Sequence, residues 1–207
     1  MLTIHLVRHG DTPQAAEGIF CGELDPPLTE HGRMQAERVG QTAATLGLKA
    51  LYCSPKLRAR QTAEPVVGTT GLEPVIENGL REIAYGRWEG LKESDVRANE
   101  RAAFAAWQDD PSLVPPPGGE TAYDIASRAM PVIARVRDRH ADGQVMIVSH
   151  KATIRIITCA LLGIPLHRFR TSVACPTASI TTFELGADGP LLIGLGDVHH
   201  LTDLASG

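Results

Sequence analysis

Residues 3–12 read Thr-Ile-His-Leu-Val-Arg-His-Gly-Asp-Thr, an apolar run that ends abruptly in charged and polar residues. The first five residues of this stretch are mostly apolar or β-branched, so they predict a β-strand. A nearly continuous apolar run suits a strand that helices cover on both faces. Arg8, His9 and Thr12 then follow the carboxyl end of a buried strand. Ligands bind at that edge in open α/β sheets.

Four further apolar runs predict strands, and helical patterns lie between them. The expected strands are 3–7, 50–53, 145–149, 179–185 and 191–195. Apolar spacing predicts one helix from near Thr29 to Gly47, another that follows a capping box of Thr121 and Asp124, and a third over 152–162. Pro65 should kink or end the helix expected over 56–67. The alternation predicts an α/β fold, a three-layer αβα sandwich around a mainly parallel sheet.

The rest of the chain adds loops to this sandwich. Asp109–Glu120 contains four prolines and predicts a long loop, which in a compact domain often carries function. Asp188-Gly189 predicts a hairpin turn between the last two strands. We expect a single domain over residues 1–207, with residues 78–120 as an irregular excursion that forms a lid and determines specificity.

Composition excludes several classes of protein. The 207 residues carry a net charge of −4, which argues against electrostatic binding of nucleic acid, since that needs a basic surface. The N-terminal apolar run is too short for a signal sequence or membrane span, and no other stretch approaches the length of a span. Cysteines 21, 53, 159 and 175 form no CxxC pair, so no zinc or thioredoxin motif is indicated. The default expectation is a cytoplasmic protein with free thiols. The pattern makes no prediction of oligomeric state.

Reactive side chains follow three of the predicted strands. Arg8 and His9 follow the first strand, Arg58 comes shortly after the second, and His150 follows the strand 145–149. Any one of these residues alone is more often structural or solvated than functional. Their joint placement at one sheet edge instead indicates an anion site that contains imidazoles able to act as nucleophiles. The other histidines lack this context.

These residues carry a resemblance to a known family. Leu6-Val-Arg-His-Gly-Asp-Thr12 resembles the RHG motif of the histidine phosphatase superfamily, in its phosphoglycerate-mutase-like branch. Further blocks occur in the family's order over nearly the whole chain. They are Gly22, Asp25-Pro-Pro-Leu-Thr29, Gly32, Gln35-Ala36, Ser54–Ala63, Leu80-Arg-Glu82, Gly86–Gly90, Pro117–Glu120 and Val148-Ser-His150.

The resemblance implies a role for each catalytic position. His9 is the nucleophile that forms a phosphohistidine, while Arg8, Arg58 and His150 surround the phosphoryl oxygens. Glu82 protonates the leaving oxygen and later deprotonates water, which requires a carboxyl that is protonated part of the time. No metal is implied, because cationic side chains neutralise the phosphoryl charge.

The resemblance also implies a set of substrate-binding positions. These are Arg8, Thr12, Cys21, Gly22, Arg58, Arg81, His150 and Lys151. Cys21 is expected to shape the pocket rather than to do redox chemistry. Two positions depart from the family pattern, since Ala15 replaces a common Asn and Lys151 replaces a usual Gly. Ala15 predicts a pocket that is less polar or is filled from elsewhere. Lys151 either points to solvent or favours acidic substrates.

Three functions are compatible with this pattern. The favoured one is a phosphatase that hydrolyses a small phosphorylated metabolite, because the chain has little room for the insertion that excludes water in full mutases. The alternative is a phosphoglycerate mutase that depends on 2,3-bisphosphoglycerate, with residues 86–120 as its lid. The third is a catalytically silent interaction module, against which the occupied catalytic positions argue. Candidate substrates are phosphoglycerate, glucosyl-phosphoglycerate, phosphoserine and phosphorylated ribazole.

Overall fold

The computed structural model describes residues 1–204, which build a mixed α/β fold around one six-stranded sheet. The strand order is β3-β2-β4-β1-β5-β6. Strands β1, β4, β2 and β3 run parallel, whereas β5 and β6 are antiparallel additions beside β1. Their bounds are β1 Leu2–Arg8, β2 Leu48–Cys53, β3 Pro74–Ile76, β4 Gly143–Ser149, β5 Ile180–Gly186 and β6 Gly189–Asp197. The predicted mainly parallel sheet is confirmed.

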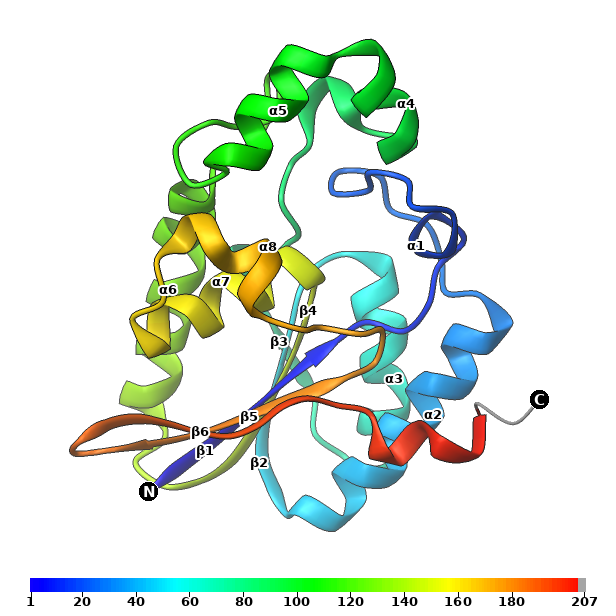
Figure 1. Cartoon of the computed structure of the whole chain (residues 1–207). Helices are drawn as coiled ribbons and strands as arrows, with labels where there is room; N and C mark the ends of the chain where they lie inside the picture. Colours follow the sequence, from blue (N-terminus) through cyan, green and yellow to red (C-terminus); the bar gives the residue numbers. More distant parts are fainter. Residues whose placement is uncertain (205–207) are drawn as a thin grey trace.

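Helices cover both faces of the sheet, which gives the expected three layers (Figure 1). Helices α2 (Glu30–Leu46) and α3 (Leu57–Thr70) pack on one face, and α6 (Ala122–Arg139) and α7 (Lys151–Leu162) pack on the other. Side chains along β1 point alternately to the two faces of the sheet, so the strand contributes to the core on each side. Leu2, Ile4 and Leu6 join the core under α6 and α7, while Val7 joins the core under α2 and α3.

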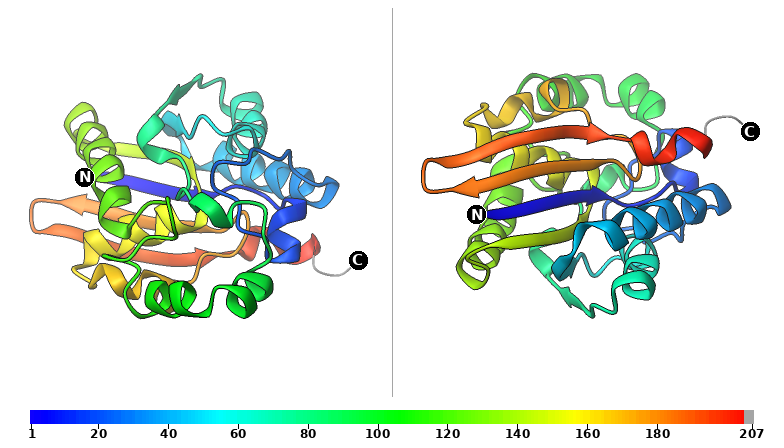
Figure 2. Two further views of the ribbon diagram at one scale, coloured as in Figure 1. Left: turned by 90° about the horizontal axis from the view of Figure 1, so that it is seen from above. Right: turned by 90° about the horizontal axis from the view of Figure 1, so that it is seen from below.

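The local signals at the two ends of these helices act as expected. The Thr29 hydroxyl caps α2 by accepting the Gly32 N–H at 2.9 Å, and Gly47 follows the helix in the left-handed conformation. Thr121 and Asp124 form the reciprocal capping box of α6. The predicted hairpin is also confirmed, although its turn is Ala187-Asp188 and Gly189 already begins β6. Figure 2 shows the β5–β6 hairpin lying beside β1 at the edge of the sheet.

The structure differs from expectation at two places. Helix α3 does not end at Pro65 but continues to Thr70. Pro65 packs closely against α2 at Gly40, where an added Cβ would lie 2.7 Å from the Pro65 ring. The short strand β3 was not predicted. It adds only three residues to the sheet edge, too few for a periodic pattern.

The segment 78–120 is more ordered than the irregular excursion that was expected. It contains two 3₁₀ turns, η1 (Asn78–Leu80) and η2 (Gly86–Trp88), and two helices, α4 (Glu93–Asn99) and α5 (Arg101–Asp109). A separate aromatic core holds these helices, formed by Phe20, Trp88, Val96, Phe104 and Trp107. In Figure 1 the two helices lie above the carboxyl ends of the parallel strands.

Four short elements and one long loop complete the described chain. They are α1 (Pro13–Glu17), η3 (Leu166–Arg168), α8 (Phe169–Ser172) and η4 (His199–Leu204), with the loop 110–121 between α5 and α6. The proline-rich loop predicted over 109–120 is therefore confirmed. Across residues 1–204, no helix is both long and apolar enough to cross a membrane.

Candidate active site

A cavity of about 140 Å³ opens at the carboxyl ends of β1 and β4. Arg8 ends β1 and His9 follows it, Arg58 stands in the first turn of α3, and Glu82 lies shortly after η1. Segments far apart in the sequence thus contribute to one pocket. The residues that line it are Arg8, His9, Thr12, Gln14, Ala15, Gly18, Ile19, Phe20, Cys21, Arg58, Glu82, Tyr85, Glu93 and Lys151.

His9 is held in the form that a nucleophile requires. Its Nδ1 lies 2.7 Å from the carbonyl oxygen of Gly10, and a carbonyl only accepts hydrogen bonds, so Nδ1 carries the proton. The neutral ring then has its lone pair on Nε2. Burial lowers the pKa of His9 well below its ordinary value, and the nearby charges of Arg8 and Arg58 lower it further. The imidazole is therefore neutral at pH 7.

His150 lies against His9 but has a different environment. The ring centroids are 5.1 Å apart, and Nε2 of His150 is 2.7 Å from the Ser54 hydroxyl. Its Nδ1 is buried and has no hydrogen-bond partner within residues 1–204. Burial lowers the pKa of His150 well below its ordinary value, with Arg58 adding to the effect. His150 is fully buried and, contrary to the substrate-binding position expected for it, is not among the residues that line the cavity.

The two arginines are buried and positioned by backbone carbonyls. Nη1 of Arg8 donates to the carbonyl of Cys175 at 2.8 Å, and its buried Nε has no partner in the described chain. Arg58 is only 1% exposed and donates to the carbonyls of Leu24 and Cys21 at 2.8 and 3.2 Å. A buried guanidinium that is held in place is a preorganised partner for phosphoryl oxygens.

The Glu82 carboxylate is held at the amino end of α7. It accepts hydrogen bonds from the backbone N–H groups of Ile83, Ala152 and Thr153 at 3.0 to 3.3 Å. Glu82 is 5% exposed and lines the cavity with His9. These donors fix its orientation, so a carboxyl group faces the same space as the His9 imidazole.

The loop 21–25 closes one side of the cavity, and the carboxylate of Glu89 holds it. Glu89 accepts the N–H groups of Gly22 at 3.1 Å and Glu23 at 2.9 Å. Gly22 passes so close to the main chain of Ile83 that an added Cβ would lie 1.7 Å from its carbonyl oxygen. Gly22 therefore permits this close approach, and it lies outside the set of residues that line the cavity.

The other predicted binding residues divide into two groups. Thr12, Cys21 and Lys151 line the cavity as expected. Burial raises the pKa of the Cys21 thiol, which keeps it protonated and agrees with a role in shaping the pocket. Arg81 is not brought to the cavity, because its guanidinium pairs with Glu120 at 3.1 Å.

The structure adds cavity residues that sequence reasoning missed. Ala15 lines the cavity, and the neighbouring Gln14 presents a buried side-chain oxygen that has no partner within residues 1–204. The Gln14 side chain therefore supplies an amide group beside position 15, where the family often has Asn. Phe20, Tyr85 and Glu93 form the opposite wall. No periodic pattern marked these residues, although Gln14 stands only two positions after the RHG motif's Thr12.

Comparison with known proteins places this geometry in context. A family model described as histidine phosphatase superfamily (branch 1) matches residues 4–198. Phosphoserine phosphatase 1 of Hydrogenobacter thermophilus is 31% identical over 201 residues, which are 97% of this chain and 95% of that protein. A probable phosphoglycerate mutase, GpmB of Erwinia tasmaniensis, is 30% identical over 210 residues, covering 99% and 97% of the two chains.

A solved structure shares the fold. A mycobacterial glucosyl-3-phosphoglycerate phosphatase, solved in complex with VO3, superposes with a TM-score of 0.86 at 28% identity. The match covers 95% of this chain and 99% of that one. The similar proteins therefore include both named phosphatases and named mutases.

Proposed function

Because this chain belongs to branch 1 of the histidine phosphatase superfamily, we propose that it is a metal-independent phosphatase acting on a small phosphomonoester. The observation that carries the proposal is the state of His9. Its Nδ1–H donates a hydrogen bond to the Gly10 carbonyl, its pKa is lowered, and its Nε2 lone pair is available beside Arg8 and Arg58. The named phosphatases among the similar proteins support the same reaction class.

In the first half-reaction the phosphoryl group moves to His9. Nε2 attacks phosphorus, the P–N bond forms, and the bond from phosphorus to the leaving oxygen breaks. Arg8 and Arg58 stabilise the charge on the phosphoryl oxygens. Glu82 donates a proton to the leaving oxygen, so the product departs as an alcohol.

In the second half-reaction water removes the phosphoryl group. Glu82, now a carboxylate, accepts a proton from the water whose oxygen attacks phosphorus. The P–N bond breaks, and its electron pair returns to Nε2. Inorganic phosphate leaves, and both His9 and Glu82 regain their starting forms. The cationic side chains supply the charge neutralisation, so no metal is assigned to either step.

The mutase alternative uses the same first half-reaction. It differs in that a second substrate hydroxyl, rather than water, accepts the phosphoryl group. Helices α4 and α5 lie over the strand ends, where a lid would exclude water (Figure 1). The similarity to a probable mutase also favours keeping this candidate.

One assay separates these functions. Release of inorganic phosphate from a panel of phosphomonoesters is measured with malachite green, with and without EDTA, beside isomerisation of 3-phosphoglycerate with added 2,3-bisphosphoglycerate. We expect phosphate release that EDTA leaves unchanged and that vanadate inhibits. Isomerisation that outpaces phosphate release would replace the proposal with the mutase. The absence of both activities, together with no vanadate binding, would indicate a silent module.

A further inference from the structure

A second cavity of about 360 Å³ lies directly beside the first one. The two cavities share four lining residues, namely Phe20, Tyr85, Glu93 and Lys151. The two cavities therefore adjoin each other along these shared residues, and the larger one forms a second compartment beside the phosphate pocket. The other end of a substrate whose phosphoryl group is at His9 would extend toward this second compartment.

The second compartment has an excess of positive charge. Lys151, Arg155 and Arg170 line it, whereas Glu93 is the single carboxylate among its lining residues. Lys151 and Arg155 are four positions apart on α7, so they share one face of that helix. The same helix begins directly after His150, so its first turns carry the cationic wall from the phosphate pocket into the second compartment.

Two of these cations have no protein partner. Within residues 1–204, neither the Lys151 ammonium nor the Arg155 guanidinium makes a hydrogen bond or an ion pair. The Nε of Arg155 is buried and unsatisfied. Burial lowers the pKa of Lys151, and the charges of Arg8 and Arg155 lower it further, in opposition to Glu82. Uncompensated cations in a partly buried cavity are stabilised by a bound anion.

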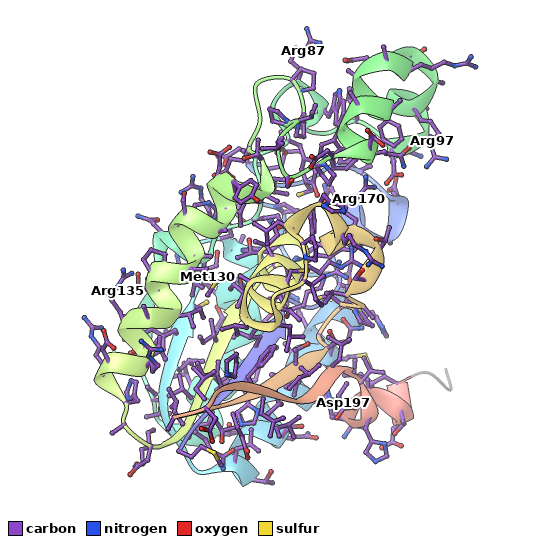
Figure 3. All side chains as sticks on the ribbon, turned by 60° about the vertical axis from the view of Figure 1, so that its left-hand side comes forward. Arg87, Arg97, Met130, Arg135, Arg170 and Asp197 are labelled. Carbon is purple, nitrogen blue, oxygen red and sulfur yellow. The ribbon has the colours of Figure 1, made fainter. Side chains whose placement is uncertain are left out.

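Arg170 is held differently and defines the far wall. Its guanidinium carbon lies 3.8 Å from the centre of the Trp107 ring, and its Nη2 is 3.9 Å from a Glu93 carboxylate oxygen. Figure 3 shows Arg170 on α8 beneath α5. The stacked ring and the Glu93 contact occupy Arg170, so Lys151 and Arg155 remain as the donors for a ligand.

We propose that this second compartment binds a carboxylate at the end of the substrate opposite its phosphoryl group, with Lys151 and Arg155 as the donors. The planar guanidinium of Arg155 matches the two oxygens of a carboxylate. The inference rests on the proposed phosphatase function and narrows its substrate class. It assigns specificity to Lys151, the position at which this chain departs from the usual Gly of its family.

Matched substrates that differ only at that end test the proposal. 3-Phosphoglycerate carries a carboxylate where glycerol 3-phosphate carries a hydroxymethyl group, and phosphoserine differs from phosphoethanolamine by the carboxylate. Since charge-assisted hydrogen bonds are strong, we expect wild-type kcat/KM to favour the carboxylated member of each pair about tenfold or more.

Two substitutions should remove this preference. In Arg155→Gln and in Lys151→Gln the ratio of kcat/KM within each pair should fall toward 1, chiefly through KM for the carboxylated substrate. Arg155→Lys should recover part of the ratio. Arg168→Gln is the matched control, since Arg168 is exposed and outside the cavity, and it should keep the wild-type ratio. Because the Lys151 side chain makes no hydrogen bond or ion pair within residues 1–204, its substitution tests the proposal even where Arg155→Gln folds poorly.

The outcomes distinguish this proposal from the proposed function. Equal kcat/KM within each pair for wild type, or a ratio that survives in both variants, overturns the carboxylate subsite while leaving the phosphatase intact. If wild type hydrolyses none of the four compounds, the panel assay described above decides the phosphatase proposal, and calorimetry on the His9→Asn variant decides the subsite. In that variant, tighter binding of 3-phosphoglycerate than of glycerol 3-phosphate supports the carboxylate subsite, provided that adding Arg155→Gln removes the difference. Equal binding of the two compounds overturns the subsite.

Discussion

His9 and His150 lie with their ring centroids 5.1 Å apart and their planes inclined at 57°. The hydrogen bond of His9 is made through Nδ1 to a backbone carbonyl, whereas that of His150 is made through Nε2 to the Ser54 hydroxyl. The two rings therefore present opposite nitrogens to their neighbours. Two imidazoles this close cannot both be charged at low cost, and burial keeps both neutral at pH 7. Only His9 lines the cavity, so the pair has one candidate nucleophile.

Replacing His9 should abolish turnover. His9→Asn removes the nucleophilic nitrogen, and we expect phosphate release to fall roughly 1,000-fold or more, as when other enzymes lose their nucleophile. Rapid quenching with ³²P-labelled substrate should trap a phosphoenzyme in wild type that survives base and is lost in acid, and none in the variant. His199→Asn changes an exposed histidine in the same way and serves as the control. Full activity in His9→Asn would show that another group attacks phosphorus.

Glu82 should matter most when the leaving group is poor. An alkoxide needs a proton as it leaves, whereas p-nitrophenolate does not. Glu82→Gln keeps an oxygen for the N–H groups of Ile83 and Ala152 but removes the transferable proton. We expect kcat/KM to fall about 100-fold or more for an alkyl phosphate and less than about tenfold for p-nitrophenyl phosphate. Equal losses on both substrates would contradict a role as general acid.

Acid should destabilise the fold through its buried histidines. In the unfolded chain His9 and His150 titrate near pH 6.5, whereas burial lowers the pKa of both in the folded state. Below pH 6.5 the unfolded state therefore binds more protons, and the free energy of unfolding falls as pH falls toward the folded-state pKa values. Above about pH 7.5 the two histidines make no pH-dependent contribution.

Urea unfolding at pH 7.5, 6.5 and 5.5 measures this dependence. Removing one such histidine in His9→Asn should reduce the loss of unfolding free energy between pH 6.5 and 5.5 by up to about 1 kcal/mol. His199→Asn, at an exposed position, should follow the wild-type dependence. If the free energy of unfolding of His9→Asn depends on pH as steeply as that of wild type, His9 is not the group that the fold keeps neutral.

The contact between Gly22 and Ile83 should not tolerate a side chain. An alanine Cβ at position 22 would lie 1.7 Å from the Ile83 carbonyl oxygen, so the main chain must move. We expect Gly22→Ala to lower the free energy of unfolding by about 2 kcal/mol or more. Gly68→Ala in α3 is the matched control, because no atom lies within 4 Å of its added Cβ. It should stabilise the protein by about 0.5–1 kcal/mol, and similar effects at both positions would rule out this steric account.

Much of the fold was predictable because its signals are local. The apolar run before Arg8, the Thr29 cap, the capping box of Thr121 and Asp124, and the glycine at 47 each act within a few residues. Such signals locate strands and helices wherever the remainder of the chain lies. They did not mark Pro65 correctly, since helix α3 continues through it to Thr70. There the proline ring packs closely against Gly40 of a different helix, a contact that no local signal marks.

The candidate site was predictable in part for the same reason. His9 and Arg8 follow one strand and His150 follows another, so parallel strands bring them to one edge. Sequence reasoning could not separate cavity residues from their neighbours. Arg81 was grouped with the binding residues, but Glu120, 39 positions away, holds its guanidinium. Gln14, Glu93 and Arg155 were missed, because no short motif contains them together.

By itself, the sequence determined the order of the main strands and helices, their caps and the residues that follow each strand, since these depend on neighbours along the chain. Tertiary structure alone decided which nitrogen of His9 is free, that His150 does not line the cavity, and that Lys151 and Arg155 line a second compartment. Those properties depend on burial and on hydrogen-bond partners that the folded chain brings from distant positions. They exist only once the sheet, α7 and the helices above it have packed together.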